Sequence, residues 1–177
     1  MNMEREFQMV NFRKIDLIGL EIKLTRSQDK NYILIRDLWK KFNPELKNIK
    51  NRRSGNWEKF GITYKKDGDI FYVASIEKTD KMILPSDMIN KEIKQGQYVC
   101  FTHIGAMDAI KTTLFDIFKK IVPKLKLEIK PNEKSGLICF ERYDYRFNWN
   151  NPNSLLEIYL PLETKQHTMT ELTKINN

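Results

Sequence analysis

The chain has 177 residues, of which 41% are hydrophobic, and a net charge of +8. This length suits one domain or two small fused halves, and the composition allows a real core and excludes a low-complexity chain. No apolar run approaches the length of a membrane span, and the N-terminus lacks the apolar core of a signal peptide. We therefore expect a cytoplasmic protein with no membrane partner.

Basic side chains gather in two runs, at residues 47–53 and 119–130. Such runs can bind nucleic acid, or they can belong to a lysine-rich surface that faces water. No helix-turn-helix, zinc finger or RNA-binding signature accompanies them. We therefore predict no sequence-specific nucleic-acid binding.

The two cysteines, Cys100 and Cys139, each lie inside an apolar, strand-like run, and the two histidines, His103 and His167, are far apart. Without a Cys-x-x-Cys pair, this pattern predicts two buried free thiols rather than a disulfide or a metal site. The sequence also lacks a phosphate-binding loop and a nucleophile elbow. We expect neither a metal nor any other cofactor.

The first half of the chain predicts a strand followed by a helix. The strand covers residues 10–24, with an interruption near Asp16, and the helix covers residues 31–43, with Asp29 or Asn31 as its cap. Apolar side chains recur along this helix at spacings of three and four, which is typical of a helix with one buried face. They are Ile35, Leu38, Trp39, Phe42 and Leu46.

Two more strands complete the first half, and the second half repeats the same order. The strands cover residues 57–64 and 70–76 and are joined by Lys66-Asp67-Gly68-Asp69, a tight-turn sequence. After a connector, a strand, a helix and two strands are predicted at residues 92–103, 107–122, 137–146 and 155–162. The two helices begin roughly 75 residues apart, which indicates an internal repeat. Since each half has one helix for one apolar sheet face, two halves that pair edge to edge would complete one α+β core.

The joint between the second predicted strand and its helix carries a recognisable motif. Residues 95–105 read Gln-Gly-Gln-Tyr-Val-Cys-Phe-Thr-His-Ile-Gly. This run resembles the signature of the GyrI-like (gyrase-inhibitor-like) small-molecule-binding domain, which occurs alone and at the C-terminal end of AraC-type and drug-sensing transcription regulators. The matching positions are the turn glycine Gly96, Tyr98, the Phe-Thr-His at 101–103, and Gly105. The family often has proline at the next position, where this chain has Ala106.

The resemblance implies a tandem βαββ repeat with pseudo-twofold symmetry. Its antiparallel sheet would carry two main helices on one face and a ligand cleft between the halves. The resemblance covers residues 8–163, with the halves at about 8–80 and 91–163. Residues 1–7 and 164–177 would then form a polar N-terminal arm and a polar C-terminal tail.

The strand from Leu137 onward places Glu141 in the middle of an apolar and aromatic face. A carboxylate there loses hydration and must find a partner. That partner is either a structural lysine, tyrosine or backbone group, or a cationic ligand held among aromatic rings. The resemblance favours the ligand, because Phe140-Glu141-Arg142-Tyr143 matches the Phe/Tyr-Glu-x-Tyr motif that supplies the pocket acid in many drug-binding members.

Other candidate ligand-binding residues are mostly aromatic. His103 either reaches the rim of the pocket or fixes the strand-to-helix turn through a backbone bond. Glu157 lies opposite the apolar face of the last strand and is predicted to face solvent. The remaining candidates for the pocket wall are Tyr143, Tyr98, Trp39, Phe60 and Tyr64, although Trp39 and Phe60 fit a place in the core equally well.

The functional hypothesis is a stand-alone bacterial effector-binding domain that reversibly binds a small, largely apolar, cationic molecule for sensing or sequestration. A separate regulator is a candidate partner. One alternative is a protein-interaction role such as modulating DNA gyrase. Another is hydrolysis of a strained, electrophilic toxin, with Glu141 as general base beside His103. Binding is favoured over catalysis, because no motif of an enzyme active site accompanies these two residues.

Overall fold

A computed structural model describes residues 7–51, 58–83, 85–125, 129 and 136–162. In this part of the chain an eight-stranded sheet has the order β1-β6-β8-β7-β3-β4-β2-β5, with every neighbouring pair antiparallel. The strands are β1 (Phe7–Phe12), β2 (Ile15–Lys23), β3 (Lys59–Lys66), β4 (Asp69–Glu77), β5 (Ile89–Ile93), β6 (Gly96–Ile104), β7 (Leu137–Tyr143) and β8 (Leu155–Pro161).

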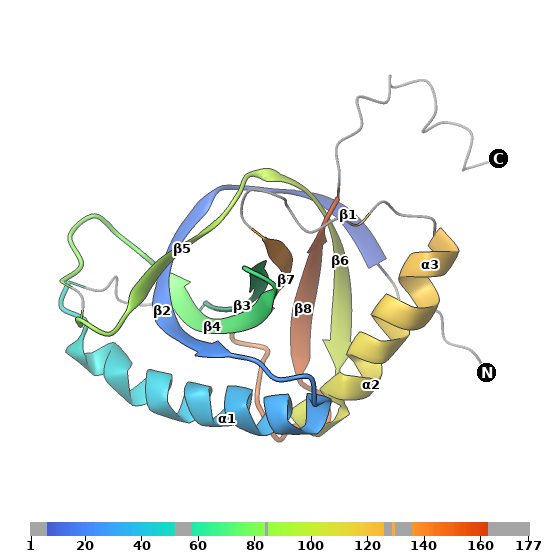
Figure 1. Ribbon diagram of the computed structural model, residues 1–177, viewed down its shortest axis with the longest axis horizontal. Coiled ribbons are helices and arrows are strands. Elements are labelled where there is room, and N and C mark those ends of the chain that lie inside the picture. Colours follow the sequence, from blue (N-terminus) through green and yellow to red (C-terminus); the bar gives the residue numbers. More distant parts are fainter. Residues whose placement is uncertain (1–6, 52–57, 84, 126–128, 130–135, 163–177) are drawn as a thin grey trace.

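Two helical segments lie on the outside of the curled sheet (Figure 1). The first is α1 (Gln28–Glu45), whose first turn is capped by Ser27 rather than by the predicted Asp29 or Asn31. The second begins with a 3₁₀ turn (Met107–Ala109) and α2 (Ile110–Phe115). It continues through a π-helical stretch (Asp116–Ile121) into α3 (Val122–Leu125). Both segments pack on the same face of the sheet, and the predicted α+β fold is confirmed.

The sheet order shows how the two halves are combined. The strands β1, β2, β3 and β4 of the first half correspond to β5, β6, β7 and β8 of the second. When each strand is exchanged for its counterpart, the sheet order is the same read from the opposite edge. The central strands β3 and β7 therefore belong to different halves and pair across the pseudo-twofold axis. The internal repeat was predicted from the sequence, because the order strand, helix, strand, strand occurs in both halves.

The edge strands are exchanged between the halves, which the sequence did not predict. The strand expected at residues 10–24 breaks at Arg13-Lys14: β1 pairs with β6 of the other half, while β2 stays beside β4. The strand expected at residues 92–103 breaks in the same way, so that β5 pairs with β2 and β6 pairs with β8. Each half thus borrows its outermost strand from the other.

The sheet has a core on each face. The larger core fills the space between the sheet and the helices and contains Leu38, Trp39 and Phe42 of α1 together with Ile110 and Ile117 of the second helical segment. The smaller core lies inside the curl of the sheet. It is an aromatic and aliphatic cluster that includes Phe60, Tyr64, Tyr98, Phe140 and Tyr159.

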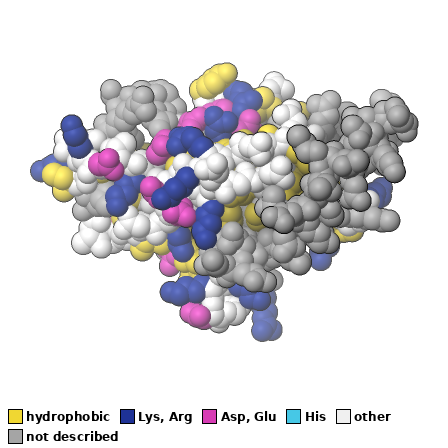
Figure 2. Space-filling view, turned by 90° about the horizontal axis from the view of Figure 1, so that it is seen from above, with side chains coloured by type: hydrophobic (Ala, Val, Ile, Leu, Met, Phe, Trp, Pro, Cys, Tyr) yellow, Lys and Arg dark blue, Asp and Glu magenta, His cyan; other side chains and the backbone are white. Residues whose placement is uncertain are grey.

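Charged side chains of both signs are interspersed on the face in Figure 2. Several form exposed ion pairs along neighbouring strands, including Lys14 with Asp16 and Glu92, and Lys23 with Asp69. This mixture differs from the single-sign stripe that is typical of a nucleic-acid interface. The absence of specific nucleic-acid binding stays a prediction.

Candidate functional site: a buried carboxylate beneath two helices

One row of residues crosses the sheet on the face beneath the helices. Cα pairing leads from strand to strand through Phe7, Phe101, Ile158, Glu141, Gly61, Ala74 and Leu20. Glu141 carries the one ionisable side chain in this row, and it stands opposite Gly61 on the central strand pair, where the two halves meet. Only 8% of its surface is exposed. Its carboxylate has therefore lost most of its hydration.

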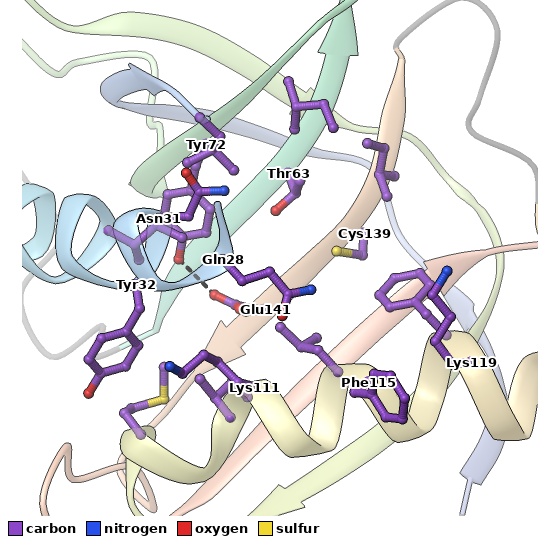
Figure 3. Close-up of a pocket in the computed structure, with 18 of the residues that line it drawn as sticks. Gln28, Asn31, Tyr32, Thr63, Tyr72, Lys111, Phe115, Lys119, Cys139 and Glu141 are labelled. Atoms are coloured by element: carbon purple, nitrogen blue, oxygen red, sulfur yellow. Dashed lines mark hydrogen bonds between the residues drawn. The ribbon is translucent and has the colours of Figure 1, made fainter. Parts of the chain in front are cut away.

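Two tyrosines bind the Glu141 carboxylate. The Tyr72 hydroxyl of β4 donates to Oε2 at 2.7 Å, and the Tyr143 hydroxyl of β7 donates to the same oxygen at 2.5 Å. The Trp39 indole N–H in turn donates to the Tyr72 hydroxyl at 3.1 Å, which fixes that ring. Both tyrosines bind Oε2, so Oε1 accepts no hydrogen bond from the described residues; the Tyr72 bond is drawn in Figure 3.

Gly61 makes this arrangement sterically possible. A Cβ atom at this position would lie 2.0 Å from the Tyr72 hydroxyl oxygen and 2.5 Å from Glu141 Oε2. Both separations are far below any van der Waals contact. The absent side chain on β3 thus makes room for the hydroxyl of β4 to reach the carboxylate of β7. Three strands from the two halves therefore build one hydrogen-bonded group.

The donors around Glu141 are neutral, and this decides its electrostatics. Burial raises the pKa of Glu141, and the hydrogen bonds from Tyr143 and Tyr72 offset that rise only in part. Burial and the nearby carboxylate also raise the pKa values of both tyrosines well above the ordinary value, so the phenols stay protonated. No Lys, Arg or His in the described part of the chain forms an ion pair with this acid. Among the residues that the structure describes, this acidic group therefore has no basic partner.

Glu141 opens onto a cavity of about 340 Å³ between the sheet and the two helical segments. Residues of α1 and of the second helical segment face it at helical spacings of three and four, and strands β3, β4 and β7 form its floor (Figure 3). The apolar and aromatic part of the wall comprises Leu24, Tyr32, Ile35, Ile70, Met107, Ile110, Leu114, Phe115, Phe118, Ile138 and Trp149. The polar part comprises Glu141 with Gln28, Asn31, Thr63, Tyr72, Lys111 and Lys119, and a mainly apolar lining with a few polar groups is typical of a small-molecule site.

Cys139 also lines this cavity, two residues before Glu141 on the same face of β7. Burial, followed by the charge of Glu141, raises the pKa of its thiol to about 12. At neutral pH the sulfur is therefore a thiol rather than a nucleophilic thiolate. It contributes a polarizable, largely apolar patch to the wall.

The structure brings together three of the residues proposed from the sequence. Glu141 lines the cavity and Tyr143 binds its carboxylate. Trp39 is buried and reaches the site through Tyr72, and its ring lies edge-on to that of Tyr143 with 5.0 Å between the ring centroids. Trp39 and Tyr143 thus support the carboxylate from behind instead of forming the cavity wall.

His103 is placed as in the alternative interpretation, in which it fixes the strand-to-helix turn. Its side chain is buried, with Nδ1 2.7 Å from the Thr113 hydroxyl and Nε2 3.2 Å from the Ala106 carbonyl oxygen. A carbonyl oxygen can only accept, so Nε2 donates to it. These bonds connect the end of β6 to the helical segment that follows. His103 lies outside the set of residues around the cavity.

Phe60, Tyr64 and Tyr98 lie on the other face of the sheet, in the core inside the curl, so their predicted place in the pocket wall has to be revised. The Tyr98 hydroxyl donates to the Lys94 carbonyl oxygen, and the Tyr64 hydroxyl donates to Glu21. The prediction assumed one apolar face. In fact side chains on both faces are buried, and strand alternation sends these three away from Glu141.

Glu157 is not a solvent-facing residue, contrary to the prediction. Its carboxylate accepts hydrogen bonds from Arg142 at 3.0 Å, Arg146 at 2.6 Å and Tyr159 at 2.7 Å. Burial alone would raise the pKa of Glu157, but the hydrogen bonds from these three residues hold it below the ordinary value. Glu157 thus belongs to a self-neutralising ion network at the margin of the core inside the curl.

Several residues of the site were not predicted from the sequence. Tyr72 and Gly61 are essential to its geometry, yet each becomes significant only through the register between strands that are distant in sequence. Lys111, Phe115 and Lys119 could have been found, because they continue the helical face that starts at Met107.

Within the described residues, no helix is long and apolar enough to cross a membrane. The same residues contain no group of three or more side chains of the kind that hold a metal ion.

Comparisons with known proteins identify the family and the fold. BrlR, a transcriptional regulator from Pseudomonas aeruginosa, is 28% identical over 130 residues, which are 72% of this chain and 46% of BrlR. The chain thus spans about half the length of this relative. The structure of SAV2435 bound to tetraphenylphosphonium matches with a TM-score of 0.69 at 15% identity, covering 93% of this chain and 98% of SAV2435.

An integron cassette protein from Vibrio cholerae matches with a TM-score of 0.56 at 17% identity, covering 89% of this chain and 95% of that protein. At such identities the two structural matches establish the fold. The family model Cass2, described as integron-associated effector binding protein, matches residues 8–162. The resemblance to the GyrI-like effector-binding fold is confirmed, and the chain belongs to the Cass2 family of integron-associated effector binding proteins.

Proposed function

We propose that this chain reversibly binds a small, largely apolar cation in the cavity, with Glu141 as the counter-charge. The observation that carries this proposal is the buried carboxylate at the floor of a mainly apolar cavity, with no basic partner among the residues that the structure describes. A desolvated charge is costly unless it is paired, and an organic cation supplies the missing partner. The aromatic rings of Tyr32, Phe115, Phe118 and Trp149 offer faces for the apolar body of such a ligand.

The ligand-bound relative supports the chemical class, since SAV2435 is described with tetraphenylphosphonium, a permanent cation with an apolar exterior. BrlR is a transcriptional regulator, and the match covers 46% of its length. The corresponding role here is to sense or sequester such a molecule, either alone or for a separate regulator. Reversible binding requires no step of covalent chemistry, in keeping with the protonated Cys139 thiol.

Titration with tetraphenylphosphonium, followed by tryptophan fluorescence, tests the proposal directly. Trp149 lines the cavity and Trp39 is bonded to Tyr72, so binding should change their emission. Glu141→Gln keeps the shape and removes the charge. We expect its affinity to fall about 10- to 100-fold, because one desolvated charge contact contributes roughly 1.5–3 kcal/mol.

Two controls sharpen this experiment. Triphenylmethanol, which is apolar and uncharged, should lose much less affinity in Glu141→Gln. Glu92→Gln removes an equal charge from the edge strand β5, where Glu92 pairs with Lys14, and should leave the titration unchanged. Mass spectrometry of the released probe should recover it intact. The proposal fails if Glu141→Gln and the wild type bind the cation equally well.

A further inference from the structure

The cavity has a second charged feature, at its rim. Lys111 and Lys119 both line it, from the same helical segment and on the same helical face, while Glu141 lies on the facing strand β7 (Figure 3). Lys111 is paired with Asp29, and its ammonium also lies 5.7 Å from the centroid of the Tyr32 ring. Lys119 is exposed and forms no ion pair with the described residues. Within the described part of the chain, Lys119 at the rim and Glu141 at the floor therefore each lack an oppositely charged partner.

These two groups set different requirements for a ligand. A simple cation satisfies Glu141 but must enter past Lys119, whose like charge opposes it. A molecule with a cationic group at one end and an anionic group at the other satisfies both, with its apolar body between them. We infer that the cavity selects amphoteric ligands: a cationic end toward Glu141, an apolar or aromatic middle, and a carboxylate or similar anion at Lys119. This inference rests on the proposed function of the cavity.

The two charges should contribute unequally. Glu141 is desolvated, so its contact governs whether a ligand binds at all. Lys119 is exposed to water, and exposed ion pairs are weak and screened by salt. We expect the rim to change relative affinities about two- to fivefold at low salt. Lys119 is thus a determinant of ligand preference.

A rhodamine methyl ester and its free acid provide a matched pair of fluorescent probes. The ester is a cation, and the acid has the same ring system and an added carboxylate. Binding of each to the full chain can be followed by fluorescence anisotropy at low salt. The wild type should bind the acid about two- to fivefold more tightly than the ester, and this preference should shrink as salt is added. In Lys119→Gln, which keeps an apolar stem, the preference should vanish.

Lys124→Gln is the matched control, since it removes the same charge from the same helical segment at a position outside the cavity lining. It should retain the wild-type preference. If Lys119→Gln retains that preference too, or if the wild type has none, the inference about the rim is wrong. Glu141→Gln separates the two proposals, because it should weaken both probes by a similar factor. If it weakens neither probe, the proposed function itself is wrong.

Discussion

Glu141 and Glu157 are carboxylates on the adjacent strands β7 and β8, the first buried and the second partly buried, and their surroundings are opposite. On the paired strands β7 and β8, Glu141 stands beside Ile158, and the next pair is Arg142 with Glu157. Glu157 accepts hydrogen bonds from two arginines and a tyrosine, and its pKa is lowered. Glu141 accepts hydrogen bonds from two tyrosines alone, and its pKa is raised. Two neighbouring residue pairs on β7 and β8 thus differ. One belongs to a network of paired charges, and in the other the acid has no basic partner among the described residues.

This difference separates a structural acid from one that is available to a ligand. In an ion network that is complete within the protein, each charge already has a partner that its loss would leave unpaired. Such a network leaves no charge for a ligand to compensate. A carboxylate held by neutral donors keeps a fixed position while its charge remains to be compensated. The comparison predicts that substitutions at the two sites will change different measured quantities.

Gly61→Ala should cause the largest loss of stability and affinity, because the added side chain clashes with the groups around Glu141. The added methyl overlaps the Tyr72 hydroxyl and the Glu141 carboxylate, so Tyr72 must move and its buried hydrogen bonds are lost. Overpacking and the loss of buried hydrogen bonds should together cost about 3 kcal/mol of unfolding free energy. Urea denaturation measures this loss, and tetraphenylphosphonium affinity should fall at least tenfold.

Gly96→Ala is the matched control for that change. A Cβ at Gly96 would meet only Tyr98 Cε2, at 3.9 Å, which is an ordinary contact. Its stability should stay within about 0.5 kcal/mol of the wild type. Equal stabilities for the two alanine variants would contradict the steric role assigned to Gly61.

Glu157→Gln should destabilise the protein without changing ligand affinity. It removes the negative charge that Arg142 and Arg146 share, although both arginines keep other acidic partners in Glu58 and Asp144. Because the network is partly exposed, we expect a cost of about 2 kcal/mol, below the value for a fully buried pair. Thermal or urea unfolding measures it. A tenfold loss of cation affinity in this variant would mean that the two acids are not independent.

The pH dependence of binding should come from Glu141. Since its pKa is raised above the ordinary value of 4.5, the empty cavity holds a protonated acid over part of the range above that pH. Affinity for a permanent cation should therefore increase with pH, by up to about tenfold per unit, and level off above the raised pKa. Glu157 has a lowered pKa and stays ionised across this window.

Folding stability should show the opposite slope in the same window. Ionising the buried Glu141 costs free energy, so the stability it contributes is complete below pH 4.5 and is lost as pH rises through the raised pKa. Glu141→Gln should lack both slopes. Calorimetric titrations and urea denaturation at several pH values test this, and a pH-independent affinity in the wild type would rule out a titrating carboxylate at the site.

The sequence was sufficient to predict the order of the elements and the position of Glu141. Helical spacing located both helices, and Asp67-Gly68 adopts the positive φ angles of the predicted hairpin turn. Strand alternation placed Glu141 on an apolar face, where it lies. These features depend on local patterns, which a single sequence carries in full.

What the sequence did not predict depends on pairing between distant strands. Alternation assigned Glu157 to the correct face, but that face proved to be partly buried because the sheet curls around a second core. Tyr72 reaches Glu141 only because Gly61 stands between them in the sheet. No local pattern encodes such a register, so it could not be derived from composition or periodicity.

The exchanged edge strands also have a consequence for how the chain folds during synthesis. Of the eight strands, β1 is synthesised first, yet its neighbour in the described sheet is β6, which ends at Ile104. Until then the nascent chain carries unpaired strand edges, which are prone to aggregation. Contacts so distant in sequence also slow folding. The two halves should therefore fold as a single cooperative unit, with β1 among the last strands to pair.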